Sequence, residues 1–280
     1  MLDRLPSEAV DAAIFCDGAV HTLYRDIETR SRAILKTVGV HRYAADASTE
    51  VLCVAYAAND DPVQLWTPGD PVPMEFIRAA NSSNWLAVAH NVTFEMAIEK
   101  QILVPRYVWP QLPLERQRCT MAAALALGLP ARLDRLAVAF ELANHKNAAG
   151  QRLMHQMSKP RRAHKDEDPA CTHWFDDQER FDRLCAYCVQ DVETERELYE
   201  RLPPLSPSEQ AIWELSCKIN ARGFCVNQHF AEAARKIAQA AAPEIDQELA
   251  EITGGAVRDQ PDCTPDSVAA ATRLYGRKAR

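Results

Sequence analysis

The chain has 280 residues, of which 47% are apolar and 25% charged, proportions typical of a folded globular protein. The net charge of −7 excludes a uniformly basic nucleic-acid-binding surface but leaves room for a local basic patch. No apolar run reaches the roughly 18 residues of a membrane span. The N-terminus lacks the basic-then-apolar order of a signal peptide. We therefore expect a cytoplasmic protein without membrane contact, whose nine cysteines are reduced thiols.

The N-terminal half alternates between strand-like and helix-like segments. Strand-like composition occurs at residues 20–27, 51–58, 63–67 and 85–90. Helical spacing occurs at residues 73–80 and 92–103. The near-continuous apolar run at 51–58 is typical of a strand buried on both faces. This alternation predicts an α/β domain with a mixed sheet.

The C-terminal half has almost entirely helical patterns, at residues 120–127, 133–142, 151–157, 176–202, 207–223 and 230–251. The pair Pro203–Pro204 ends the fourth of these helices and predicts a domain boundary. The next helix should begin with a capping box, in which Ser206 is the N-cap and Glu209 its acidic partner. A C-terminal helical appendage is therefore expected.

Three short motifs carry the chemistry. In the first, Asp26 and Glu28 stand two residues apart at a strand end, which places both carboxylates on one face. Such a pair repels unless a cation lies between the two groups, and Mg²⁺ or Mn²⁺ prefers oxygen ligands of this kind. Taken alone, the two residues could equally be exposed surface acids.

The second motif follows the strand at 85–90. Asn91 is expected to cap the next helix, and Glu95 lies four residues later on the same helical face. In the third motif, Tyr187 and Asp191 share one face of the long helix, one turn apart. Each of these two motifs has an ordinary alternative. The second could be a capped helix with an acidic first turn, and the third a partly buried tyrosine beside a solvated acid.

Taken together and in this order, the motifs resemble those of the DEDD (DnaQ-like, ribonuclease-H-like) 3′–5′ exonuclease superfamily, tyrosine subclass. The segments LYRDIET, LAVAHNVTFE and YCVQDVETE look most like the proofreading domain of bacteriophage-type family A DNA polymerases. One departure is Glu95, where the family usually has Asp. The histidine of the other subclass would stand at position 186, which is Ala186 here.

The resemblance implies an α/β, ribonuclease-H-like mixed sheet flanked by helices. It implies an N-terminal extension at 1–18, an exonuclease domain at 19–204 and, at 205–280, a helical segment that resembles the start of a family A polymerase module. The segment INARGFCVN carries this last similarity. The palm carboxylates of that family have no recognisable counterpart after Gly223, so polymerase activity is expected to be absent.

The resemblance also implies a catalytic mechanism. Two divalent ions, Mg²⁺ or Mn²⁺, would be held by the four acids and would hydrolyse the terminal phosphodiester of DNA to release nucleoside monophosphates. The catalytic set is Asp26, Glu28, Glu95, Tyr187 and Asp191, with Glu95 acting through water and the Tyr187 hydroxyl orienting the attacking water. Thr29 and Asn91 are candidates for contacts to the 3′ end of the substrate.

A basic stretch at 145–165 contains six Lys or Arg residues, three His and no acid. We expect it to contact the phosphates of single-stranded DNA, or of a frayed 3′ end of duplex DNA, through Lys146, Arg152, Lys159, Arg161 and Arg162. A solvated loop that merely offsets acidic charge elsewhere would have the same composition. A polymerase is a further possible partner.

Three alternatives stay open from the sequence. The first is an RNA-processing 3′–5′ exonuclease with the same chemistry, and the second is a non-catalytic nucleic-acid-binding remnant of a truncated polymerase. The third is a zinc site, because Cys171, His173, Cys185 and Cys188 are ligand types that zinc accepts. Spacing of three residues on a helix suits the packing of buried thiols equally well.

Overall fold

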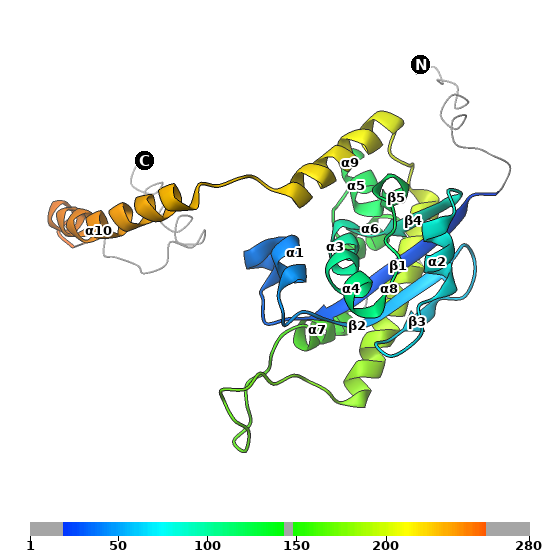
Figure 1. The fold of residues 1–280 in the computed structure, drawn as a ribbon, viewed down its shortest axis with the longest axis horizontal. Coiled ribbons are helices and arrows are strands. Elements are labelled where there is room, and N and C mark those ends of the chain that lie inside the picture. The colour runs from blue at the N-terminus through cyan, green and yellow to red at the C-terminus, as the bar shows by residue number, and fades with distance from the viewer. Residues whose placement is uncertain (1–18, 143–147, 256–280) are drawn as a thin grey trace. The chain divides into compact units, whose positions relative to one another are not determined.

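The computed structural model describes residues 19–142 and 148–255. The chain divides into two compact units, with the boundary between Arg222 and Gly223. The first unit contains a five-stranded sheet in the order β3-β2-β1-β4-β5 (Figure 1). The strands are β1 (His21–Arg30), β2 (Glu50–Ala58), β3 (Gln64–Trp66), β4 (Trp85–Ala89) and β5 (Gln117–Cys119).

Strand β1 is central and organises the sheet. It pairs antiparallel with β2 and parallel with β4, while β3 and β5 complete the two edges. This mixed sheet with helices around it confirms the expected α/β, ribonuclease-H-like class. The β1–β2 register shifts between Glu28 and Thr29, where Leu52 of β2 has no partner, so the pairing becomes irregular directly after the second acid of the first motif.

Helices of the first unit cover both faces of this sheet. They are α1 (Leu35–Ala45), α2 (Met74–Asn81), α3 (Thr93–Ile98), α4 (Val104–Tyr107), α5 (Thr120–Ala126), α6 (Leu133–Ala139), α7 (Ala148–Met157), α8 (Gln178–Arg201) and α9 (Pro207–Arg222), with a π-helix η1 (Glu99–Leu103) and a 3₁₀ helix η2 (Leu114–Arg116). The long α8 packs against β1 and β2.

The two faces of β1 have separate cores. Leu23 and Ile27 join the largest cluster, which includes Phe76 of α2 and Ile98 of α3. Tyr24 points the other way and packs with Val192 of α8. Side chains alternate along a strand, so Asp26 and Glu28 project on the α8 side of the sheet and Arg25 on the opposite side.

Most expected elements are present, and the main differences lie in α1, in the segment 92–103 and in β5. Helix α1 was not expected; it contains Gly39 at φ 74, where two helical segments meet at a kink. The expected helix at 92–103 is α3 followed by the π-helix η1. The short edge strand β5 was also not expected. The capping box at α9 is confirmed, because Ser206 N donates to Glu209 Oε2 and Glu209 N donates to Ser206 Oγ.

The described part of the second unit consists mainly of α10 (Gln228–Ile252). The side chain of Asn227 caps this helix by accepting a hydrogen bond from Phe230 N at 3.0 Å. Within the residues that the structure describes, no helix combines the length and apolar character needed to cross a membrane. The expected N-terminal extension at 1–18 lies outside the described residues.

Candidate active site

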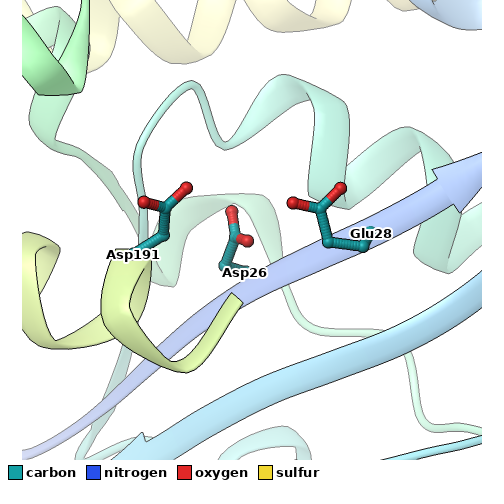
Figure 2. A group of neighbouring side chains, drawn as sticks. All are labelled: Asp26, Glu28 and Asp191. Carbon is teal, nitrogen blue, oxygen red and sulfur yellow. The ribbon is translucent and has the colours of Figure 1, made fainter. Parts of the chain in front are cut away.

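Strand β1 and helix α8 bring three carboxylates together. Asp26 and Glu28 project from the same face of β1, and Asp191 reaches toward them from α8 (Figure 2). One carboxylate oxygen from each residue lies within 4.8 Å of the corresponding oxygen of the other two. Two of the three expected motifs therefore meet at one point, although they are separated by most of the domain in sequence.

The electrostatics of this group favour a cation. Glu28 and Asp191 are buried, at 8% and 5% exposure, where mutual repulsion between carboxylates is weakly screened. A hard divalent ion offsets that repulsion and accepts carboxylate oxygens as ligands. The donor set therefore fits Mg²⁺ or Mn²⁺.

Glu95 of α3 is a fourth acid at the site, but it is not part of the group within 4.8 Å. Its side chain is buried at 3% exposure. Burial raises the pKa of the Glu95 carboxyl well above its usual value, and the nearby charge of Asp26 raises it further. Among the described residues, its Oε2 atom has no hydrogen-bond partner. A buried carboxylate oxygen of this kind suits an ion or a water molecule between Glu95 and Asp26.

Glu195 is a fifth acid that the motifs did not reveal. It follows Asp191 by one turn of α8 and is 1% exposed. Its Oε2 accepts a hydrogen bond from His90 N at 2.8 Å. Burial and the charge of Asp26 raise the pKa of the Glu195 carboxyl well above its usual value. The spacing of four residues from Asp191 was the available signal in the sequence.

Arg25 supplies positive charge from the opposite face of β1. Its side chain is fully buried and donates to Glu99 Oε1, to Gln117 Oε1 and to the carbonyl of Val88. This cation lowers the pKa values of Glu95 and Glu195, partly offsetting the effect of their burial. The sequence signal for it was an arginine on the same strand face as the apolar Leu23 and Ile27.

Tyr187 lies beside the acids with 4% exposure. Burial raises the pKa of its hydroxyl far above the usual value, and the negative charges of Asp191 and Glu28 raise it further. The phenol therefore keeps its proton at neutral pH. Its ring packs with Leu153 and Met157 of α7.

A thiol also touches the acidic group. The Cys188 Sγ donates to Asp26 Oδ2 at 3.3 Å, and burial raises the pKa of this thiol. In the described part of the chain, the acidic triad is the one group of at least three candidate ligands, so Cys171, His173, Cys185 and Cys188 do not converge on a zinc site.

The two candidates for contacts to the substrate's 3′ end have other partners. The Thr29 hydroxyl is buried and lies 2.9 Å from the Tyr43 hydroxyl. The expectation that Asn91 caps α3 is wrong, because Val92 is the N-cap residue. Asn91 instead has a left-handed backbone at φ 65, and its Oδ1 accepts a hydrogen bond from the Thr93 hydroxyl. Its short polar side chain tolerates this conformation.

The basic stretch is only partly available to a substrate. Arg152, Lys159 and Arg162 are exposed, whereas Lys146 lies outside the described residues. Arg161 forms a two-pronged ion pair with Glu167, and its Nε donates to the Trp174 carbonyl. Glu167 stands just beyond the acid-free window, which is why the sequence pattern did not reveal this pair. Arg161 therefore connects the segments around Glu167 and Trp174 through its hydrogen bonds.

No family model matches the chain. It is 35% identical over 211 residues to a DNA polymerase of Bacillus phage SP02, a match that spans 74% of this chain and 32% of the polymerase. The chain thus corresponds to about a third of its relative. This homology confirms the expected resemblance to a phage DNA polymerase. The sheet order and the carboxylate group agree with the arrangement that the DEDD resemblance implies.

Among solved structures, the catalytic core of RRP6 from Trypanosoma brucei is 12% identical, with a TM-score of 0.36, and covers 70% of this chain and 42% of its own. Brucella melitensis NrnC with bound Mg²⁺ is 13% identical, with a TM-score of 0.37, and the match covers 70% of this chain and 80% of the NrnC chain. At these scores the two similarities carry no argument about function.

Proposed function

We propose that this chain is a metal-dependent, proofreading-type 3′–5′ exonuclease that hydrolyses the terminal phosphodiester of DNA and releases nucleoside monophosphates. One observation carries the proposal: the carboxylates of Asp26 and Glu28 from the central strand and of Asp191 from α8 lie within 4.8 Å of one another. A phosphodiester brings further negative charge, so such an acidic site can accept it only together with cations.

The four acids would hold two divalent ions, Mg²⁺ or Mn²⁺. Asp26, Glu28 and Asp191 are the proposed direct ligands, and the buried Glu95 would act through water. When bound, the ions supply charge neutralisation at the phosphate and lower the pKa of water. Two further buried charges act on the proposed ligand Glu95: Arg25 lowers the pKa of its carboxyl, and Glu195 raises it.

The Tyr187 hydroxyl is the proposed orienting group for the attacking water. Its raised pKa keeps the proton on the phenol, so the phenol can donate a hydrogen bond while it accepts another. Because the ring is packed between α7 and α8, the hydroxyl position is fixed before the substrate binds.

Single-stranded DNA, or the frayed 3′ end of a duplex, is the proposed substrate. The homology to a phage DNA polymerase favours DNA over RNA. Arg152, Lys159 and Arg162 are the exposed cations proposed to contact its phosphates. A polymerase is a proposed partner and the cytoplasm the proposed location. We expect no template-directed extension, because in the described residues the acidic triad is the one carboxylate group suited to metal ions.

The proposal is tested with a 5′-labelled single-stranded DNA and a titration of Mg²⁺ or Mn²⁺. The expected result is a ladder that shortens from the 3′ end, with nucleoside monophosphates as products. Asp26→Asn should abolish cleavage, because it replaces one of the three carboxylates proposed to bind the ions directly. Glu179→Gln is the matched control, since Glu179 is an exposed acid of α8 outside the triad.

Each other outcome decides against part of the proposal. DNA binding without cleavage at any ion concentration would favour the non-catalytic remnant. Cleavage of a sequence-matched RNA in preference to DNA would favour the RNA-processing alternative. Full activity of a folded Asp26→Asn protein would contradict the proposed site itself.

A further inference from the structure

Helix α7 touches the ring of Tyr187 at a glycine. A Cβ atom placed on Gly150 would lie 2.2 Å from Tyr187 Cδ2 and 2.9 Å from Cε2. Carbon atoms that are not bonded to each other do not approach so closely, since optimal separations are about 3.5–4.0 Å. The backbone of α7 therefore comes so near to the ring that position 150 has room for hydrogen alone.

The conformation of Gly150 does not explain the glycine. It lies inside α7, and it is not among the glycines with positive φ in the described residues. Alanine would suit the interior of a helix better, because glycine is the poorest helix former after proline. The close contact with the ring is thus the structural reason for glycine at this position.

The remaining surroundings of the ring leave it little freedom. Leu153 and Met157, one and two turns after Gly150, pack in the same cluster as Tyr187 and Leu184. Tyr187 itself is 4% exposed. A side chain added at position 150 therefore has to displace either the ring or the whole of α7, since closely packed interiors lack spare volume.

We infer that Gly150 is a positioning residue for Tyr187: its missing side chain lets α7 press on the ring and hold the hydroxyl beside Asp191. The inference rests on the proposed exonuclease function for its catalytic consequence. Gly150 contacts no reacting atom in this proposal and acts through the tyrosine alone. A shift of about 1 Å in such a group can cost a factor of about 100 in rate.

The catalytic test compares Gly150→Ala in two backgrounds. In the wild-type background, we expect kcat to fall roughly 10- to 100-fold, with KM for DNA changed less than about twofold. In the Tyr187→Phe background, the same substitution should cause almost no further loss, because the hydroxyl is already gone. Gln156→Ala, on an exposed position of α7, should leave kcat unchanged. An equal loss in both backgrounds would overturn the inference.

A second test needs no activity. Gly150→Ala should lower the melting temperature in the wild-type background but raise it in the Tyr187→Ala background, where the ring is absent and helix propensity decides. A destabilising effect of the same size in both backgrounds would show that the ring is not what excludes a side chain. If the wild-type protein does not cleave DNA, the proposed function fails while this cycle still decides whether Gly150 contacts Tyr187 as inferred.

Discussion

Arg25 and Glu99 form an ion pair inside the first unit, with Arg25 Nε 2.5 Å from Glu99 Oε1. The arginine comes from the central strand, and Glu99 is the first residue of the π-helix η1. Both side chains are withdrawn from solvent, at 0% and 6% exposure. Glu99 thereby holds the Arg25 guanidinium on the face of β1 opposite to Asp26. From there the positive charge of Arg25 lowers the pKa values of Glu95 and Glu195.

Arg25→Met should destabilise the protein strongly. The substitution leaves Glu99 as a buried charge without its partner, which typically costs about 3–5 kcal/mol. Urea denaturation should show this loss in the free energy of unfolding. Arg132→Gln is the matched control, because it breaks an exposed ion pair with Asp134 that is worth no more than about 1 kcal/mol. Equal losses in the two variants would contradict a structural role for the buried pair.

Tyr187→Phe should slow cleavage by roughly 10- to 1,000-fold, because it removes one orienting hydroxyl and keeps the packed ring. Affinity for Mg²⁺, measured as the ion-dependent rise in melting temperature, should remain close to that of the wild type. A collapse of that thermal response would mean that the phenol helps to hold the ion.

Arg162→Glu should weaken DNA binding and reduce its dependence on salt. Each lost phosphate contact lowers the log–log slope for a single strand by about 0.7. Arg161→Gln should leave the slope almost unchanged, since Arg161 is engaged with Glu167. Binding isotherms at several salt concentrations separate the two. Identical slopes for wild type and Arg162→Glu would show that this part of the basic stretch does not contact DNA.

The Arg161–Glu167 pair should make stability depend on acid pH. Arg161 and the backbone N–H of His164 lower the pKa of the Glu167 carboxyl to about 2. A lowered pKa means that the stabilisation is complete above the ordinary pKa of glutamic acid and is lost as the pH falls toward 2. Glu167→Gln should therefore melt below the wild type at neutral pH, with the difference disappearing in strong acid. If the difference in melting temperature between the two proteins grew as the pH fell, the proposed contribution of the ion pair would be contradicted.

Truncation should distinguish two possible ends of the nuclease. Cutting after Arg222 follows the boundary between the compact units and should preserve cleavage and melting temperature. Cutting after Pro204 also removes Trp213, which packs on the buried cluster of Val92 and Cys119. That loss should cost about 2 kcal/mol, while cleavage remains measurable. If the two truncated proteins have the same melting temperature, α9 does not contribute to the stability of the first unit.

The sequence predicted what depends on local pattern. The apolar run of β2, the length of α8 and the Ser206 capping box all follow from residues close to one another. The spacing of Asp26 and Glu28 also fixed their common face, because side-chain alternation along a strand needs no tertiary information.

Features that depend on distant contacts were not predictable in this way. The π-helix η1 begins at Glu99, whose partner Arg25 lies far away in sequence. The pairing of Arg161 with Glu167 was not predictable, because Glu167 stands just outside the basic stretch. Gly150 gave no signal at all, since only the folded chain brings α7 against the Tyr187 ring.

The central place of β1 also determines how the site responds to local unfolding. This strand pairs with both β2 and β4 at Leu23 and Tyr24, and with β2 alone at Asp26 and Glu28, while β3 and β5 are short edge strands. Edge strands open with little free energy, whereas a doubly paired strand separates only when most of the domain does. Fraying of the sheet margins therefore leaves the doubly paired residues Leu23 and Tyr24 in register, and amide exchange at these two residues reports the cooperative opening of the sheet that carries Asp26 and Glu28.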